Sequence, residues 1–422
     1  MNILELLIVL LLLVIIGMII LAYLINRKFT LSAMNYDTVD TWVLDPNENN
    51  FNKTNYLNCL NSINYVYDLY VDSVTNVNRI LGDIVRQIDV DFLLEDPQIL
   101  FSQTQISNRL NTLPLLNMQY YTPFGIIARI KNSSTGFISF RGTSNLGEWA
   151  TDASSFNLVY PSKLTAYKTA SKFGQRNSLV GVNDSQLPQN CGVGEGWYDV
   201  YASTPGQITE NNCVCTDTCK DGTCRILYPN QIGKIVGITE CSAAPVPCGL
   251  LLCDRCKTNE GGKPICNVIY DYVNENTTIN DYIICGHSLG AAVAILCAFH
   301  MESVFKKVRC VYAFASPMVG NQDFANTYDA ILKDKTFRIS NTNDAIPYLP
   351  GSTPGKSGNL NKDYVNLSNR CYTFTQNFPG FKPYSSKYHS LNDSYKKSYD
   401  TIQTNLDDPS FYPDCLSDKE MK

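Results

Sequence analysis

Charged side chains are scarce in this sequence. Asp, Glu, Lys and Arg make up 17% of its 422 residues, against about 25% in an ordinary soluble domain. A long disordered chain is excluded, because such chains are rich in charge and poor in apolar residues, whereas 44% of this chain is hydrophobic. An excess of basic residues is also missing, and the net charge is −5. We therefore expect no nucleic-acid partner, since that binding depends on phosphate neutralisation.

One long hydrophobic run stands near the start of the chain. Leu6–Ile25 contains no charged residue, and a helix of about 20 residues spans the hydrocarbon core of a bilayer. A cleaved signal peptide is the alternative, but its apolar region is normally about 7–15 residues long and follows a basic start. Here Glu5 precedes the run instead. We expect residues 1–28 to form a retained transmembrane anchor with its flank.

Beyond this run the sequence pattern changes twice. Residues 29–115 predict a helical lead-in, because Tyr56–Leu81 carries apolar residues at three- and four-residue spacing. Residues 116–422 predict an α/β domain, because short β-rich runs alternate with helical patterns, as in a mostly parallel sheet. Between residues 205 and 266 a cysteine-rich segment without helical or strand period interrupts this domain, and we interpret it as an insertion.

The predicted insertion holds nine of the sixteen cysteines, and Cys191 shortly before it makes ten. Such a segment has few large apolar residues, so disulfides or a metal must stabilise it. Cys253 and Cys256 have the spacing of a zinc knuckle, but no second clean pair accompanies them. An even set with irregular spacing favours five disulfides. Three other cysteines lie in core patterns and are expected to be buried free thiols, namely Cys285, Cys297 and Cys310.

Two features disagree on the membrane side. Arg27 and Lys28 follow the hydrophobic run, and the positive-inside rule would leave the bulk of the chain in the cytoplasm. Disulfides persist in oxidising compartments, so the cysteines favour a lumenal, extracellular or virion-exterior side. We give the cysteines more weight. The side stays open on the sequence alone.

A candidate nucleophile lies in the pentapeptide Gly286–Gly290, which reads GHSLG. In a G-x-S-x-G motif a sharp strand-to-helix turn exposes the serine, and both glycines avoid collisions there. The apolar run YIIC precedes this motif and the helical pattern AAVAILCAF follows it, as that turn requires. Ser288 is therefore the predicted nucleophile.

The base and the acid follow by elimination. A serine nucleophile needs an imidazole to accept its proton, and the chain contains only three histidines. His287 lies inside the pentapeptide and should point away from the serine hydroxyl, while His300 is expected to be a solvated residue at a helix end. His389 remains as the base. The acid should follow a strand between serine and base, which favours Asp344 over Asp323 at the start of a predicted helix.

Six blocks resemble, in order, the motifs of the class 3 (fungal-type) lipase family: FRGTSNLGEWATD, GWYDVY, GHSLGAA, FASPMVGNQDFA, RISNTNDAIPYLP and YHSL. The resemblance covers about Tyr120–Tyr395 apart from the insertion. It implies an α/β-hydrolase fold with a mostly parallel central sheet and hydrolysis of carboxylic esters of acyl lipids. It also implies the same nucleophile, acid and base that the elimination favours, namely Ser288, Asp344 and His389.

The resemblance further implies an oxyanion hole, with one donor at Thr143 and the other at the backbone N–H of Leu289. Each such donor contributes roughly 3 kcal/mol in sites of this kind. Asp152 would fix the Thr143 side chain, and Trp149 matches a further position that packing alone also explains. Residues 144–160 correspond to the lid of relatives. The 145 residues from Thr143 to Ser288 exceed what the family needs, which leaves the lid boundaries open.

These observations predict a membrane-anchored serine hydrolase of the lipase or phospholipase type, with lipid as substrate and no metal or organic cofactor. One departure from the family is Ala291, where a second glycine usually follows the pentapeptide. Two alternatives remain. The chain could be a catalytically degenerate anchored protein whose cysteine-rich segment binds a partner, or an esterase acting on other substrates.

Overall fold

The computed structural model describes residues 39, 41–44, 51–75, 81–105, 119–143, 157–161, 170–171, 174–183, 186–204, 263–350, 363–367 and 370–398. The expected transmembrane run, residues 205–262 of the expected insertion, and the sequence-predicted positions Trp149 and Asp152 lie outside this set. Within it, no helix combines the length and apolar character needed to cross a membrane.

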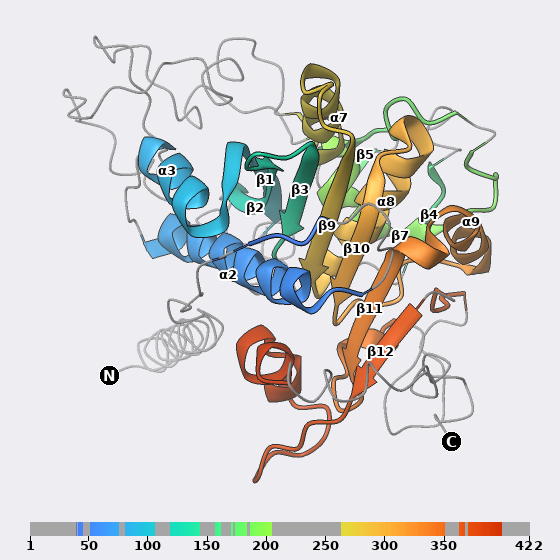
Figure 1. Ribbon diagram of the computed structural model, residues 1–422. Helices are drawn as coiled ribbons and strands as arrows, with labels where there is room; N and C mark the ends of the chain where they lie inside the picture. The colour runs from blue at the N-terminus through green and yellow to red at the C-terminus, as the bar shows by residue number, and fades with distance from the viewer. Residues whose placement is uncertain are drawn as a thin grey trace, which may run out of the picture.

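A seven-stranded mixed sheet forms the centre of the fold (Figure 1). In spatial order its strands are β1 (Leu94–Gln105), β2 (Gln119–Ile130), β3 (Thr135–Phe140), β9 (Asp281–His287), β10 (Val308–Phe314), β11 (Thr336–Asn341) and β12 (Arg370–Phe374). The first three strands are antiparallel, and β3 to β12 pair in parallel. The expected α/β architecture with a mostly parallel central sheet is confirmed.

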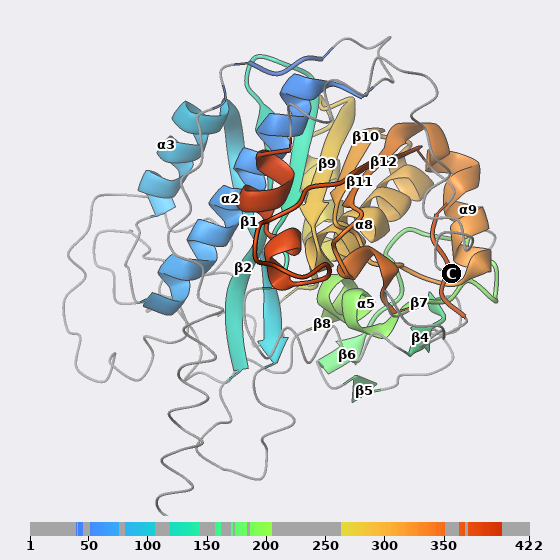
Figure 2. The ribbon, with the colours of Figure 1, turned by 90° about the horizontal axis from the view of Figure 1, so that it is seen from below.

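Helices cover both faces of this sheet (Figure 2). One face packs against α2 (Lys53–Thr75) and α3 (Leu81–Phe92). The other face packs against α5 (Glu195–Ala202), α7 (Ile265–Glu275), α8 (Leu289–Phe305) and α9 (Gln322–Leu332). Side chains along β9 alternate between the two cores, because successive residues of a strand point to opposite faces. Tyr282 and Ile284 join the core under α8, and Ile283 and Cys285 join the core under α2.

The central helix α8 is buried on all sides. Every residue from Leu289 to Ser303 is buried, and a helix that is apolar all round belongs in a core. This overturns one expectation, because His300 lies inside α8 and is fully buried instead of solvated. Its Nδ1 lies 2.9 Å from the Tyr201 hydroxyl and its Nε2 lies 2.7 Å from the Val180 carbonyl oxygen.

The expected helical lead-in differs from the structure in one respect. Helices α2 and α3 lie in this range, and β1 lies within it as well and pairs with β2 along its length. Leu94–Gln105 is therefore an edge strand of the central sheet. The expected hairpin is present, since β2 and β3 are antiparallel and residues 131–134 form the turn between them.

Short elements surround the main sheet. Two small antiparallel sheets lie on the side of α5: β4 (Leu158–Val159) with β7 (Val193–Gly194), and β5 (Ala170–Ser171) with β6 (Gly174–Arg176) and β8 (Ser203–Thr204). Arg176 pairs with both Asp199 and Glu195 and so connects β6 to α5. Towards the end of the described chain, a short helical turn (Ser386–His389) leads into a wider turn (Leu391–Lys396).

Among the cysteines that the structure describes, one prediction agrees with the structure and another does not. Cys285, Cys297 and Cys310 are buried free thiols, as expected. Cys191 and Cys266 are also free and buried, so the prediction that they belong to a set of five disulfides is wrong. Both side chains lie in the core beside α8, and Cys266 is part of helix α7. Helix α7 begins at Ile265, within the range 205–266 expected for the insertion. The other eight cysteines of the predicted set lie outside the described residues.

Candidate active site

Ser288 lies at the junction between β9 and α8. Its backbone adopts φ 58° and ψ −126°, a strained conformation that non-glycine residues rarely adopt. A Cβ on Gly286 would lie 2.1 Å from the Gly290 carbonyl oxygen, and a Cβ on Gly290 would lie 2.2 Å from the Arg141 carbonyl oxygen. Both glycines are therefore required by close backbone approach. The sharp strand-to-helix turn is present as predicted, and it holds Ser288 at the carboxyl edge of the sheet.

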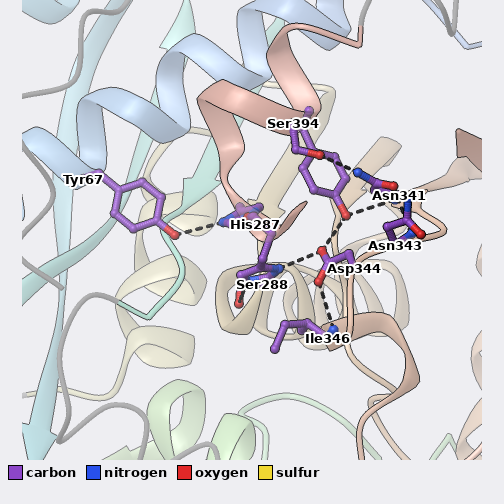
Figure 3. Close-up of polar contacts among 10 residues, drawn as sticks. Tyr67, His287, Ser288, Asn341, Asn343, Asp344, Ile346 and Ser394 are labelled. Carbon is purple, nitrogen blue, oxygen red and sulfur yellow. Dashed lines mark hydrogen bonds and ion pairs between the residues drawn. The ribbon is translucent and has the colours of Figure 1, made fainter. Parts of the chain in front are cut away.

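His389 connects Ser288 to the carboxylate of Asp344, two residues that lie near each other in Figure 3. The His389 Nε2 lies 2.7 Å from the Ser288 Oγ, and the Nδ1 lies 2.8 Å from the Asp344 Oδ2. Because the carboxylate can only accept, Nδ1 carries the proton and Nε2 is free to accept the serine proton. These three residues come from three separate segments, and the structure brings all three together. Asp323, the weaker candidate for the acid, is exposed near the start of α9.

Asp344 is fully buried just after β11. Its Oδ1 accepts a hydrogen bond from the backbone N–H of Ile346 at 3.0 Å, and its Oδ2 accepts one from the Tyr395 hydroxyl at 2.8 Å. The backbone N–H of Asn341 donates to that same hydroxyl at 3.2 Å, so Tyr395 is held in place to donate (Figure 3). Burial and the neighbouring carboxylate raise the pKa of Tyr395 well above its usual value. The hydroxyl therefore keeps its proton.

The expected oxyanion donors border the serine. Leu289 is the first residue of α8, where a backbone N–H has no partner within the helix. Thr143 follows Gly142, and a Cβ on Gly142 would lie 2.8 Å from the Ser288 Cβ. This segment therefore runs directly alongside the serine.

The orientation of the Thr143 peptide depends on Arg141. This arginine is fully buried, and its guanidinium donates to the Gly142 carbonyl oxygen at 2.7 Å and to the Pro123 carbonyl oxygen at 2.7 Å. In a trans peptide the N–H points opposite to the carbonyl, so the Thr143 N–H points away from the Arg141 side chain. The guanidinium also lies 4.2 Å from the ring centroid of Tyr70 on α2, where a cation is attracted to the ring face.

His287 points away from the serine hydroxyl, as expected. Its Nδ1 lies 2.9 Å from the Tyr67 hydroxyl, and its Nε2 lies 3.0 Å from the His389 carbonyl oxygen. Burial, with the neighbouring His389 as a smaller cause, lowers the pKa of His287 well below its usual value. Tyr67 and Tyr395 both touch the site, yet no sequence motif indicated either residue. The only available signal for Tyr395 was its position six residues after His389.

Among the described residues, no cluster of three or more His, Cys, Asp or Glu side chains could hold a metal ion. The chemistry that the arrangement offers is instead nucleophilic. A serine hydroxyl, an imidazole and a buried carboxylate form one continuous line of hydrogen bonds, which is the arrangement that activates serine for attack on a carbonyl carbon.

The family model for Lipase (class 3) matches residues 262–353. Among curated proteins, the secreted mono- and diacylglycerol lipase A of Penicillium cyclopium is 41% identical over 70 residues, covering 17% of this chain and 22% of the relative. Phospholipase A1-II 1 of Oryza sativa subsp. indica is 38% identical over 82 residues, covering 19% and 20%. The chain thus spans about a fifth of the length of these curated relatives.

Two solved structures illustrate the structural comparison. The native Rhizomucor miehei lipase propeptide complex is 17% identical, with a TM-score of 0.37 and coverage of 83% of this chain and 75% of that chain. A triacylglycerol lipase described as having a serine protease triad is 18% identical, with a TM-score of 0.38 and coverage of 80% and 90%. The family match itself includes both Ser288 and Asp344. Over residues 262–353, this chain is similar to the class 3 lipase family.

Proposed function

We propose that this protein is a serine hydrolase that cleaves carboxylic esters of acyl lipids through Ser288, His389 and Asp344. The observation that carries the proposal is the unbroken line of hydrogen bonds from the Ser288 Oγ through the His389 imidazole to the buried Asp344 carboxylate. The strained backbone of Ser288 at the carboxyl edge of the sheet supports it. Lipid esters are the proposed substrates because the matched relatives include a mono- and diacylglycerol lipase and a phospholipase A1.

The proposed reaction has two halves. The His389 Nε2 accepts the Ser288 proton while the Oγ attacks the ester carbonyl carbon, and the negative charge on the carbonyl oxygen rests against the N–H groups of Thr143 and Leu289. The imidazolium, stabilised by Asp344, then gives its proton to the departing alcohol and an acyl-enzyme remains. In the second half, His389 deprotonates a water that attacks the acyl carbon, and the imidazolium then returns this proton to the Ser288 Oγ as the acyl–oxygen bond breaks and the fatty acid leaves.

Replacement of the serine tests this assignment. Ser288→Ala should lower hydrolysis of a short-chain nitrophenyl ester by at least about 10³-fold, because no nucleophile remains. It should also abolish labelling by a fluorophosphonate, which reacts with activated serines. Ser133→Ala is the matched control, because Ser133 lies in the turn between β2 and β3 at the opposite edge of the sheet. A wild-type protein that is folded but does not label would favour the degenerate, non-enzymatic alternative.

We also propose that Leu6–Ile25 anchors the protein in a membrane. The support is the length of this uncharged run, together with a substrate class that resides in membranes. The double substitution Leu12→Arg/Val14→Arg should shift the full-length protein from the membrane fraction to the supernatant. Each arginine at the middle of the bilayer raises the free energy of insertion by roughly 3 kcal/mol. If the doubly substituted protein still resisted carbonate extraction, the anchor would have to lie elsewhere.

A further inference from the structure

One tyrosine on α2 contacts two different parts of the candidate active site. The Tyr67 hydroxyl accepts a hydrogen bond from the backbone N–H of Gly142 at 2.8 Å, and it lies 2.9 Å from the Nδ1 of His287. His287 in turn reaches the carbonyl oxygen of His389. A continuous chain of hydrogen bonds therefore joins the loop of the expected oxyanion donor to the backbone of the expected base. Figure 3 shows its link between Tyr67 and His287.

The direction of every bond in this chain is fixed. A carbonyl oxygen only accepts, so the His287 Nε2 must carry the proton and donate to His389. The Nδ1 of a neutral imidazole is then an acceptor, so the Tyr67 O–H donates to it. The same hydroxyl oxygen retains a lone pair that accepts from Gly142. This single hydroxyl therefore acts as donor and acceptor at once.

Packing at Gly142 shows how closely these parts fit. A Cβ at this position would lie 2.5 Å from the Tyr67 hydroxyl, 2.7 Å from the His287 carbonyl oxygen and 2.8 Å from the Ser288 Cβ. Tyr67 and the turn that carries the nucleophile therefore both lie close to Gly142, on the side where a Cβ would project. Removing the hydroxyl would leave a buried N–H and a buried imidazole nitrogen without this partner, and unsatisfied buried polar groups are costly.

We propose that Tyr67 and His287 act as one pair of positioning residues, which fixes the oxyanion loop and the base His389 relative to each other. The proposal rests on the proposed function, since it assigns the pair a role in that reaction. Neither residue touches the reacting atoms. Tyr67 binds the N–H of Gly142, the residue before Thr143, and His287 binds the carbonyl oxygen of His389, the residue that accepts the serine proton.

The neutrality of His287 fits this role. Its ring centroid lies 4.7 Å from that of His389, so a charged His287 would repel the imidazolium that forms on His389 during the reaction. Burial lowers the pKa of His287, and the donor–acceptor pattern described above requires the neutral ring. The pair therefore supports the base mechanically without adding a like charge beside it.

A comparison of two tyrosine variants in the full-length protein tests the pair. Tyr67→Phe should lower kcat on a short-chain nitrophenyl ester by about 10- to 100-fold with KM within about twofold, because only the alignment of donor and base changes. Tyr65→Phe is the matched control: it removes a buried hydroxyl from the same helix, where the partner is Gln87. Tyr67→Phe should melt below Tyr65→Phe, because it leaves two buried polar groups without their partner, and both variants should be folded at the assay temperature. If Tyr67→Phe keeps the kcat of Tyr65→Phe, the positioning role is wrong.

The second part of the test asks whether the two residues act as a unit. His287→Gln retains an amide donor for the His389 carbonyl but removes the acceptor for Tyr67. In the doubly substituted protein Tyr67→Phe/His287→Gln, kcat should be no lower than in the less active of the two single variants, because both changes break the same chain of hydrogen bonds. If the losses of kcat in the two single variants multiply in the double variant, the two residues act independently and the proposal is wrong. If His287→Gln fails to fold, His287→Asn replaces it, since Asn keeps an acceptor near Tyr67 and loses the donor to His389.

Failure of the proposed function is distinguishable from failure of this inference. A wild-type protein that neither hydrolyses the ester nor reacts with a fluorophosphonate overturns the function and the positioning role together. An active wild type with a fully active Tyr67→Phe variant overturns the pair alone and leaves Ser288 as nucleophile.

Discussion

Two of the three histidines are held neutral inside the protein. Burial lowers the pKa of His300 to about 4, and it lowers the pKa of His287 well below the usual value. His300 has the same arrangement of partners as His287: a tyrosine hydroxyl faces Nδ1 and a backbone carbonyl faces Nε2. Such an arrangement satisfies both nitrogens of the neutral ring, and burial disfavours the charged form. Both side chains therefore stabilise the fold only while they remain unprotonated.

This predicts a loss of stability in mild acid. The unfolded His300 titrates near pH 6.5 and the folded one near 4, so the unfolded state binds more protons and stability falls as the pH drops between these values. The His300 contribution between pH 7 and 4.5 is about 2 kcal/mol. His300→Gln should be less stable at pH 7 but should lack this part of the acid dependence. Denaturant titrations at both pH values measure it, and equal acid sensitivity in both proteins would contradict it.

At the residue scale, the sequence predicts a functional residue where its type is rare in the chain or where it stands at a characteristic place in a motif. Elimination among three histidines singled out His389, and the position after a strand singled out Asp344. The environment of His300 was predicted wrongly, because a helix end and a buried helix interior look alike when the whole segment is apolar. Tyr67 could not be predicted, since it lies 220 residues from His287 along the chain and its helix carries several tyrosines.

The close contact between α8 and β3 makes two adjacent positions respond differently. Gly290→Ala would push a Cβ to 2.2 Å from the Arg141 carbonyl oxygen, so the helix start and the loop that carries Thr143 must separate. We expect a loss of most ester hydrolysis together with a lower melting temperature. Ala291→Gly, which restores the more usual family residue, removes a buried methyl and should cost about 1 kcal/mol in helix stability with the site intact. Assays of both variants would contradict this if Gly290→Ala were the milder change.

Elements were predictable where local pattern and tertiary environment agree. Strand β9 and helix α8 carry uninterrupted apolar runs, because both are buried within the fold. Strand β1 was missed because it is an edge strand with polar residues and Pro97. Its pairing with β2 is irregular between Glu95 and Gln98, beside Asp96 at φ 50°. Edge strands tolerate such residues because one side needs no hydrogen-bond partner.

At the scale of the whole molecule, the lead-in is part of the fold. Helix α2 supplies a large share of the core on one face of the sheet, and it also supplies Tyr67. A protein that starts at Thr30 should therefore remain folded and active. A protein that starts at residue 116, the predicted start of the α/β domain, should fail to fold, because it lacks α2, α3 and β1. Circular dichroism and ester hydrolysis of both proteins would decide, and a folded, active shorter form would contradict this interpretation.

The membrane side is testable through one exposed asparagine. Asn132 begins an Asn-Ser-Ser acceptor sequence and lies exposed in the turn between β2 and β3. Asn366 also begins a glycosylation sequence, but its side chain is already engaged, because it accepts a hydrogen bond from the buried Arg338. Because β3 runs parallel to β9, this turn lies at the edge of the sheet opposite Ser288, and a glycan there would leave the site open.

If the bulk of the chain is lumenal or extracellular, expression in a glycosylating cell should give a glycosidase-sensitive mass shift that Asn132→Gln reduces by one glycan. Asn366→Gln should leave that shift unchanged, which controls for the substitution itself. Free Cys191 and Cys266 weaken the cysteine argument for an oxidising compartment. Glycosylation of Asn132 therefore decides the membrane side. An unglycosylated wild type with an accessible Asn132 would place the bulk of the chain on the cytoplasmic side, in agreement with Arg27 and Lys28 after the hydrophobic run.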